Sequence, residues 1–68
     1  MINYKIDIVS VQDRDYLVAE IWIDGELFAE INQEREKINI QFYPFKENSF
    51  PFDEIVNIIF EAKKILLE

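Results

Sequence analysis

The chain has no cysteine and no histidine, and it contains a single glycine among its 68 residues. Without cysteine it forms no disulfide or thiolate metal site, and without histidine it lacks the commonest metal ligand and general base. One glycine is too few for a phosphate-cradling loop, and Ser10 and Ser49 have no histidine to activate them. We therefore expect a protein that is not an enzyme and has no catalytic residues, no cofactor and no metal.

Positive charge is also scarce, because 7 Lys and Arg stand against 14 Asp and Glu, which gives a formal net charge of −7. Nucleic acids and anionic membranes bind clustered basic side chains, and the basic residues here are scattered along the chain. The sequence therefore predicts no nucleic acid and no membrane as partner. A basic protein partner would be attracted by long-range steering, although net charge can equally serve solubility alone.

Long hydrophobic runs are missing as well. The most apolar run, 55–60, is interrupted by Asn57 and is too short to span a bilayer, and the N-terminus does not resemble a signal peptide. We therefore expect a cytoplasmic protein with one domain, 1–68. Half of the residues are hydrophobic, which is too many for a disordered acidic tail. Because so small a domain has a small core, binding to a partner or a second copy is a reasonable expectation.

Alternation of apolar and polar residues predicts four strands, over 2–11, 16–22, 27–31 and 37–43. After Pro44 the spacing of apolar residues becomes helical and predicts a helix over 52–67, with Asp53 as its N-cap. The expected fold is α+β, with a four-stranded antiparallel meander sheet and one C-terminal helix packed on one face (ββββα). Val56, Phe60 and Leu67 widen the apolar stripe of the helix, which is usually core but leaves a dimer contact open.

The turn at Asp24-Gly25 decides which face of the sheet each residue occupies. A two-residue loop pairs Ala19 with Glu30 and so puts a carboxylate on the apolar face. A three-residue loop, with Gly25 in the left-handed conformation of a bulge, pairs Ala19 with Ala29 and makes that face uniformly apolar. We therefore predict the three-residue loop, with the odd-numbered residues of 17–31 facing the helix.

In this register the open sheet face carries large apolar side chains beside carboxylates. Trp22 and Phe28 would lie in water there, and exposed rings of that size usually mark an interface. We predict that they anchor a basic protein partner whose Arg and Lys pair with the neighbouring acids. The predicted partner-binding residues are Trp22, Phe28, Tyr16, Val18, Glu20, Glu26 and Glu30. A second copy, or the 44–52 loop with its three Phe, would be alternative covers for this face.

Two acidic turns are weak candidates for a cation site, Asp13-Arg14-Asp15 and Glu34-Arg35-Glu36. Ca²⁺ prefers six to eight oxygen ligands from a shaped loop, and each of these turns has an arginine at its centre. We interpret both turns as solvated hairpin tips.

The hairpin segment 18–31 (VAEIWIDGELFAEI), followed by the helix at 52–67, resembles small acidic bacterial proteins of the immunity or inhibitor type, which neutralise a toxin by binding it. Three strands followed by the helical stretch 61–67 (EAKKILL) are also similar to the degenerate ferredoxin-like fold of HicB-type antitoxins. Neither resemblance implies catalytic residues. The leading hypothesis is a non-catalytic module that inhibits or sequesters a basic protein partner through the open sheet face. The alternative is a self-associating structural or regulatory homodimer.

Overall fold

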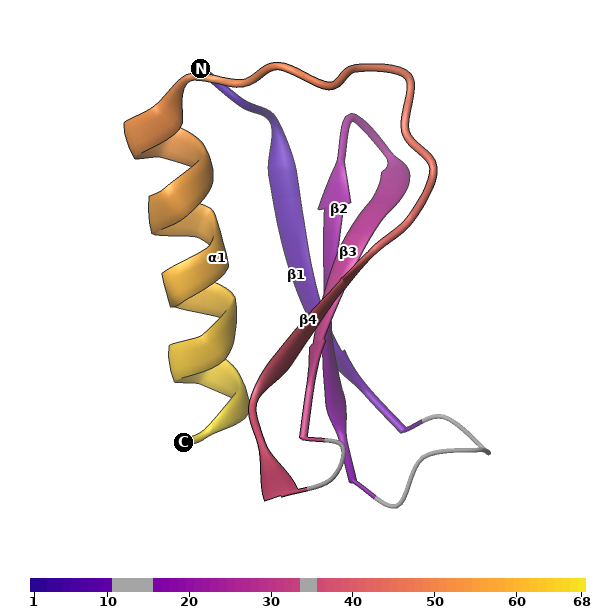
Figure 1. Ribbon diagram of the computed structural model, residues 1–68, viewed down its shortest axis with the longest axis vertical. Helices are drawn as coiled ribbons and strands as arrows, with labels where there is room; N and C mark the ends of the chain where they lie inside the picture. Colours follow the sequence, from indigo (N-terminus) through magenta and orange to yellow (C-terminus); the bar gives the residue numbers. More distant parts are fainter. Residues whose placement is uncertain (11–15, 34–35) are drawn as a thin grey trace.

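The computed structural model describes residues 1–10, 16–33 and 36–68. Within them, four strands and one helix follow in the order β1 (Tyr4–Val9), β2 (Val18–Ile23), β3 (Glu26–Asn32), β4 (Asn39–Phe42) and α1 (Phe52–Leu66). Neighbouring strands are antiparallel, and their order in the sheet is β1-β2-β3-β4. Figure 1 shows α1 on one side of this sheet. The predicted α+β fold, ββββα, is therefore confirmed.

A two-residue turn joins β2 to β3, so the predicted three-residue loop is wrong. Ile23 pairs with Glu26, and the two residues between them have positive φ, 50° for Asp24 and 78° for Gly25. Positive φ at both central residues is the requirement of a type I′ turn, whose twist matches that of the flanking strands. The left-handed conformation expected of Gly25 is present, in a loop that is one residue shorter.

The extra residue that the apolar pattern demands lies inside β3. The register pairs are Ile21 with Ala29, Trp22 with Leu27 and Glu20 with Glu30. Phe28 is therefore the extra residue of a β-bulge. Ile21 and Trp22 are neighbours in β2, whereas their partners Ala29 and Leu27 in β3 are separated by Phe28. The bulge keeps Glu30 off the apolar face, which a two-residue turn alone would not do.

The bulge exchanges the faces of two neighbouring residues. Leu27, predicted to face the helix, lies opposite Trp22 on the face away from α1. Phe28, predicted for the open face, is 7% exposed and belongs to the hydrophobic core. Leu17, which was also predicted to be buried, precedes β2 and is 51% exposed. The predicted alternation thus holds for Ala19, Ile21, Ala29 and Ile31 and fails at positions 17, 27 and 28.

The core lies between α1 and the first three strands. Its buried residues are Ala19, Ile21, Ile23, Phe28, Ala29, Ile31, Ile58 and Ala62. The alanines are fully buried, and their small side chains let α1 approach the middle of the sheet. The helix packs mainly on β2, less on β3 and β1, and makes almost no contact with β4. The helix-facing side of β4 is therefore left without helical cover.

Pro51 is the N-cap of α1, so the prediction of Asp53 as N-cap is wrong. Asp53 lies in the first turn with Glu54, where acidic side chains favour the helix dipole, and Lys63 and Lys64 lie in the last turn. Within the described part of the chain no side chain caps the start of the helix, because the N-cap residue is a proline, which has no polar side-chain group.

Two hydrogen bonds connect the beginning of the chain to α1. Glu54 Oε1 accepts the Ile2 backbone N–H at 3.0 Å, and Glu61 Oε1 accepts the Tyr4 hydroxyl at 2.7 Å. The bond to Glu61, with a smaller contribution from burial, raises the pKa of Tyr4 above its ordinary value. One side of α1 therefore faces β1, and the opposite side faces β4.

The substitution Gly25→Ala tests the turn. The added Cβ meets no atom within 4 Å, so its cost is the strain of positive φ, about 1–2 kcal/mol of unfolding free energy. Urea denaturation measures the loss. The matched control, Asp24→Asn, keeps a residue that tolerates positive φ and leaves stability within about 0.5 kcal/mol. Unchanged stability in Gly25→Ala would contradict the left-handed turn.

Candidate functional site

A row of carboxylates crosses three strands on the face away from α1. In register, Asp7 lies opposite Glu20, and Glu20 lies opposite Glu30. Like charges that face each other across a sheet destabilise it, unless neighbouring groups pair with them. Lys5 Nζ lies 3.3 Å from Asp7 Oδ2, and Glu20 Oε1 accepts the Trp22 indole N–H at 3.2 Å. The face is acidic, and at its edge Lys5 partly neutralises Asp7.

Glu30 is the buried member of this row, with 4% of its surface exposed. Its Oε1 accepts the Tyr43 hydroxyl at 2.7 Å, and its Oε2 accepts the Asn32 amide N–H at 3.0 Å. Asn32 is buried as well. A buried polar network that is hydrogen-bonded in this way makes the middle of the sheet rigid. Glu30 therefore belongs to the internal structure of the sheet.

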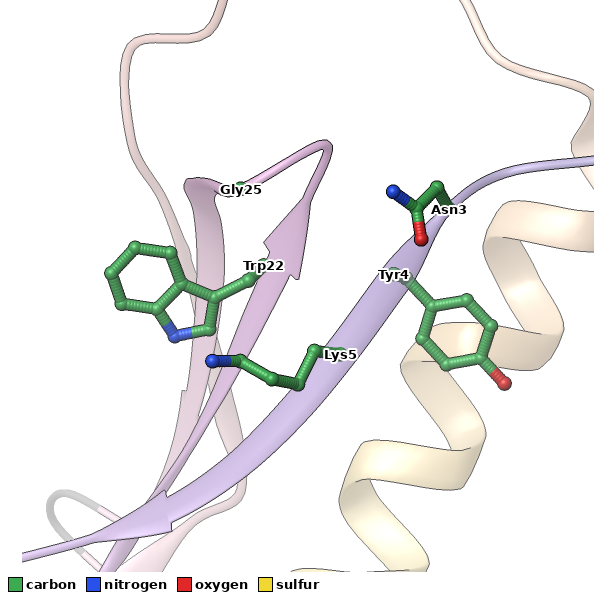
Figure 2. Close-up of a pocket in the computed structure, with 5 residues that line it drawn as sticks. All are labelled: Asn3, Tyr4, Lys5, Trp22 and Gly25. Atoms are coloured by element: carbon green, nitrogen blue, oxygen red, sulfur yellow. The ribbon is translucent and has the colours of Figure 1, made fainter.

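Trp22 is the large aromatic residue that remains on the open face. Figure 2 shows its indole and the Lys5 side chain on the side away from α1, whereas Tyr4 points toward the helix. Lys5 Nζ lies 5.6 Å from the centroid of the indole ring, which is within the range of a cation–π contact. A hollow of about 320 Å³ beside the indole is lined by Asn3, Tyr4, Lys5, Trp22 and Gly25.

The structure separates the predicted partner-binding residues into accessible and buried groups. Trp22 and Glu20 are half-buried, and Tyr16 is exposed just before β2. Glu26 is exposed too, but it pairs with the core residue Ile23 and therefore lies on the face of the sheet that α1 covers, not on the open face. Its Oε2 lies 3.1 Å from Lys46 Nζ, an ion pair that raises the pKa of Lys46.

Three of the predicted residues are buried, and the prediction that they are exposed is wrong. Val18 is 1% exposed, Phe28 is 7% exposed, and Glu30 is held in its polar network. Phe28 is buried because the bulge turns it into the core. The burial of Val18 has no explanation in the contacts of the described residues. Of the predicted site, the structure brings together Trp22 and Glu20 on the open face.

A second hollow, which the sequence did not predict, lies between α1 and β4. It has a volume of about 500 Å³ and is lined by Phe28, Phe42, Tyr43, Phe45, Glu47, Asn48, Phe50, Ile55 and Ile59. We call it the α1–β4 groove. A sequence signal for it existed in the apolar alternation of Ile38, Ile40 and Phe42, which predicts a core face but does not show whether the helix reaches it.

Phenylalanine rings make up much of the lining of the α1–β4 groove. The Phe28 ring makes edge-to-face contacts with Phe42, Phe45 and Phe50 at centroid distances of 5.6, 5.5 and 5.2 Å. Phe45 and Phe50 come from the segment between β4 and α1, which passes the tip of the β2–β3 hairpin in Figure 1. These two rings therefore pack on the core side of the sheet and do not cover Trp22.

The candidate cation turns lie wholly or partly outside the described residues, which omit 11–15 and 34–35. Among the residues that are described, no three His, Cys, Asp or Glu side chains are grouped to hold a metal ion. In the same part of the chain, no helix has the length and apolarity needed to cross a membrane.

Comparison with protein-family models, with curated proteins and with solved structures finds no match to this chain. The resemblances to immunity-type proteins and to HicB-type antitoxins therefore stay predictions.

Two neighbouring substitutions test the bulge that separates these surfaces. Phe28→Ala removes a core ring and should cost about 3–5 kcal/mol, comparable to the whole stability of a domain this small. Leu27→Ala removes a half-buried side chain of the open face and should cost about 1 kcal/mol. Urea and thermal denaturation followed by circular dichroism measure both losses. If Leu27→Ala lost more stability than Phe28→Ala, Leu27 and not Phe28 would be the core residue, and the bulge in β3 would be contradicted.

Proposed function

We propose that this protein is a non-catalytic acidic module that inhibits or sequesters a basic protein partner through the open face of its sheet, in the manner of immunity or anti-defence proteins. The observation that carries the proposal is the position of Trp22. It is the only tryptophan of the chain, and it lies on the face without a helix, beside two accessible carboxylates.

Trp22 has the properties of a binding anchor. Tryptophan is enriched among the residues that dominate the energy of protein interfaces. Here Glu20 holds the indole N–H and Lys5 lies over the ring, so its orientation is set before a partner arrives. A pre-oriented side chain loses less conformational entropy on binding, which leaves more of the contact energy as affinity.

The charges around Trp22 favour a basic partner. Asp7 and Glu20 face each other across β1 and β2, and a partner guanidinium between them would relieve their repulsion while forming charge-assisted hydrogen bonds. The net charge of −7 would also speed the encounter with a positively charged protein. The proposed contact set is therefore Trp22, Glu20 and Asp7, with Leu27 beside Trp22, and Phe28 acts as structural support.

The substitution Trp22→Ser tests this function. Immobilised wild-type protein retains a basic protein from its native lysate, and Trp22→Ser weakens the interaction with that purified protein by about 30-fold or more. Isothermal titration calorimetry gives the affinities. The matched control is Leu67→Ser, which removes an apolar side chain from the end of α1 and leaves the affinity unchanged.

The double variant Asp7→Asn, Glu20→Gln tests the role of charge in the same interaction. It should slow association severalfold at low salt and make the association rate less sensitive to salt, as stopped-flow fluorescence of Trp22 would measure. If the wild type and a folded Trp22→Ser variant bound the purified basic protein with equal affinity, the proposed function would be contradicted.

A further inference from the structure

We propose that β4 pairs with β4 of a second copy of this chain along the outer edge of the sheet. The result is a two-fold symmetric homodimer with one continuous antiparallel sheet, to which each copy contributes its four strands. This inference goes beyond the proposed function and does not rest on it, because the interface is an edge of the sheet and Trp22 lies on its open face.

The first argument is the direction of the backbone groups of β4. Among the described residues β4 is the last strand of the sheet, so its outer side faces no further strand. The Tyr43 backbone N–H donates to the Phe28 carbonyl oxygen at 3.0 Å. Because backbone groups alternate in direction along an antiparallel strand, Gln41 also points its N–H toward β3, whereas Ile40 and Phe42 point theirs outward. Outward N–H and C=O groups make such an edge a template for another strand.

The second argument is the absence of charge on this edge. Of the four strands that the structure describes, β4 alone contains no charged residue. The other edge strand, β1, carries Lys5 and Asp7, and charged side chains are a common protection of sheet edges. A two-fold axis brings a strand beside its own sequence, and β4 meets its copy without like charges opposite each other. The strand can therefore pair with itself although the chain has a net charge of −7.

The third argument is that one register satisfies the outward groups of both strands. If the two-fold axis passes between the two Ile40 residues, Ile40 lies opposite the partner's Ile40, and Phe42 lies opposite the partner's Ile38. These are the residues whose backbone groups point outward, so each pair can exchange two N–H···O bonds. A shift by two residues would bring Pro44 opposite Ile38, and proline has no N–H to donate.

This register also matches the side chains on both faces. Ile40 and Phe42 pair with core residues of β3, so their side chains lie on the face that α1 covers. A two-fold axis perpendicular to the sheet leaves each face on its own side, so these apolar side chains meet their own copies. Asn39 lies beside the partner's Gln41 on the open face, where amide groups can donate and accept hydrogen bonds.

The arrangement leaves room for both helices. Each α1 packs mainly on its own β2. From β2 through β3 and β4 to the partner's β4, β3 and β2 there are five strand spacings, about 24 Å in all. A helix is about 10 Å wide with its side chains, so the two helices lie on the same side of the sheet without contact.

The exposed area sets the expected strength of the dimer. Phe42 is 59% exposed, Ile38 41% and Ile40 36%. At about 200 Å² for a large side chain, they leave roughly 270 Å² of each copy in water. This is less than the roughly 800 Å² that each partner of a standard interface buries, so we expect a weak dimer with a dissociation constant of about 10–100 µM.

Amide hydrogen exchange followed by nuclear magnetic resonance tests the edge in the unmodified chain. The Ile40 and Phe42 N–H groups should exchange fast at micromolar protein concentration and slowly at millimolar concentration, because only the dimer bonds them. The Gln41 and Tyr43 N–H groups, which point toward β3, should be protected at both concentrations. Exchange at Ile40 and Phe42 that does not change with concentration would overturn the proposal.

A charge exchange at Ile40 tests the register, because this residue faces itself across the axis. Analytical ultracentrifugation should give dissociation constants at least about 10-fold higher for Ile40→Lys alone and for Ile40→Glu alone, since each puts like charges opposite each other. An equimolar mixture of the two variants should dimerise again, because lysine then lies opposite glutamate. Circular dichroism checks that both variants are folded.

The matched control is Phe60→Glu, which puts a charge on an exposed apolar residue of α1. It should leave the dimer unchanged, because the helices do not meet. A dimer that Phe60→Glu breaks, a mixture that associates no better than Ile40→Lys alone, or a wild type that stays monomeric at millimolar concentration would each contradict pairing through β4.

Discussion

The bulged residue Phe28 determines what each face of the sheet carries. Without an extra residue in β3, the two-residue turn at Asp24-Gly25 would place Glu30 on the face that α1 covers, where a carboxylate has no water. The bulge moves Glu30 to the open face, where Tyr43 and Asn32 bind it. It also directs the Phe28 ring into the core, where three further phenylalanine rings pack around it.

The width of the sheet explains the second surface. A helix about 10 Å wide covers two or three strands that are spaced about 4.8 Å apart. Here α1 is centred on β2, so β4 lies beyond its reach, and the apolar side chains of Ile40 and Phe42 in β4 and of Ile38 just before it stay exposed. The segment between β4 and α1 fills part of the gap with Phe45 and Phe50. The remaining space is the α1–β4 groove.

The two surfaces differ in chemistry because they lie on opposite sides of one sheet. The open face is acidic, and its Trp22 ring is held by polar neighbours, which suits a charged partner. The groove side is apolar and is lined largely by phenylalanine and isoleucine side chains.

The sequence alone was enough to predict the order of the elements, the position of the turn at Asp24-Gly25 and the apolar stripe of the helix, because these depend on local spacing and on the backbone freedom of glycine. It also showed that one extra residue was needed to keep Glu30 off the apolar face. It did not determine where that residue lies, because an insertion in the loop and a bulge at Phe28 both satisfy this requirement. Packing between distant parts of the chain selects the bulge, since the large Phe28 ring fills the space between β3, β4 and the phenylalanines that precede α1, which Leu27 would fill less well. The reach of the helix across the sheet was likewise a property of the packed layers and not of any local pattern.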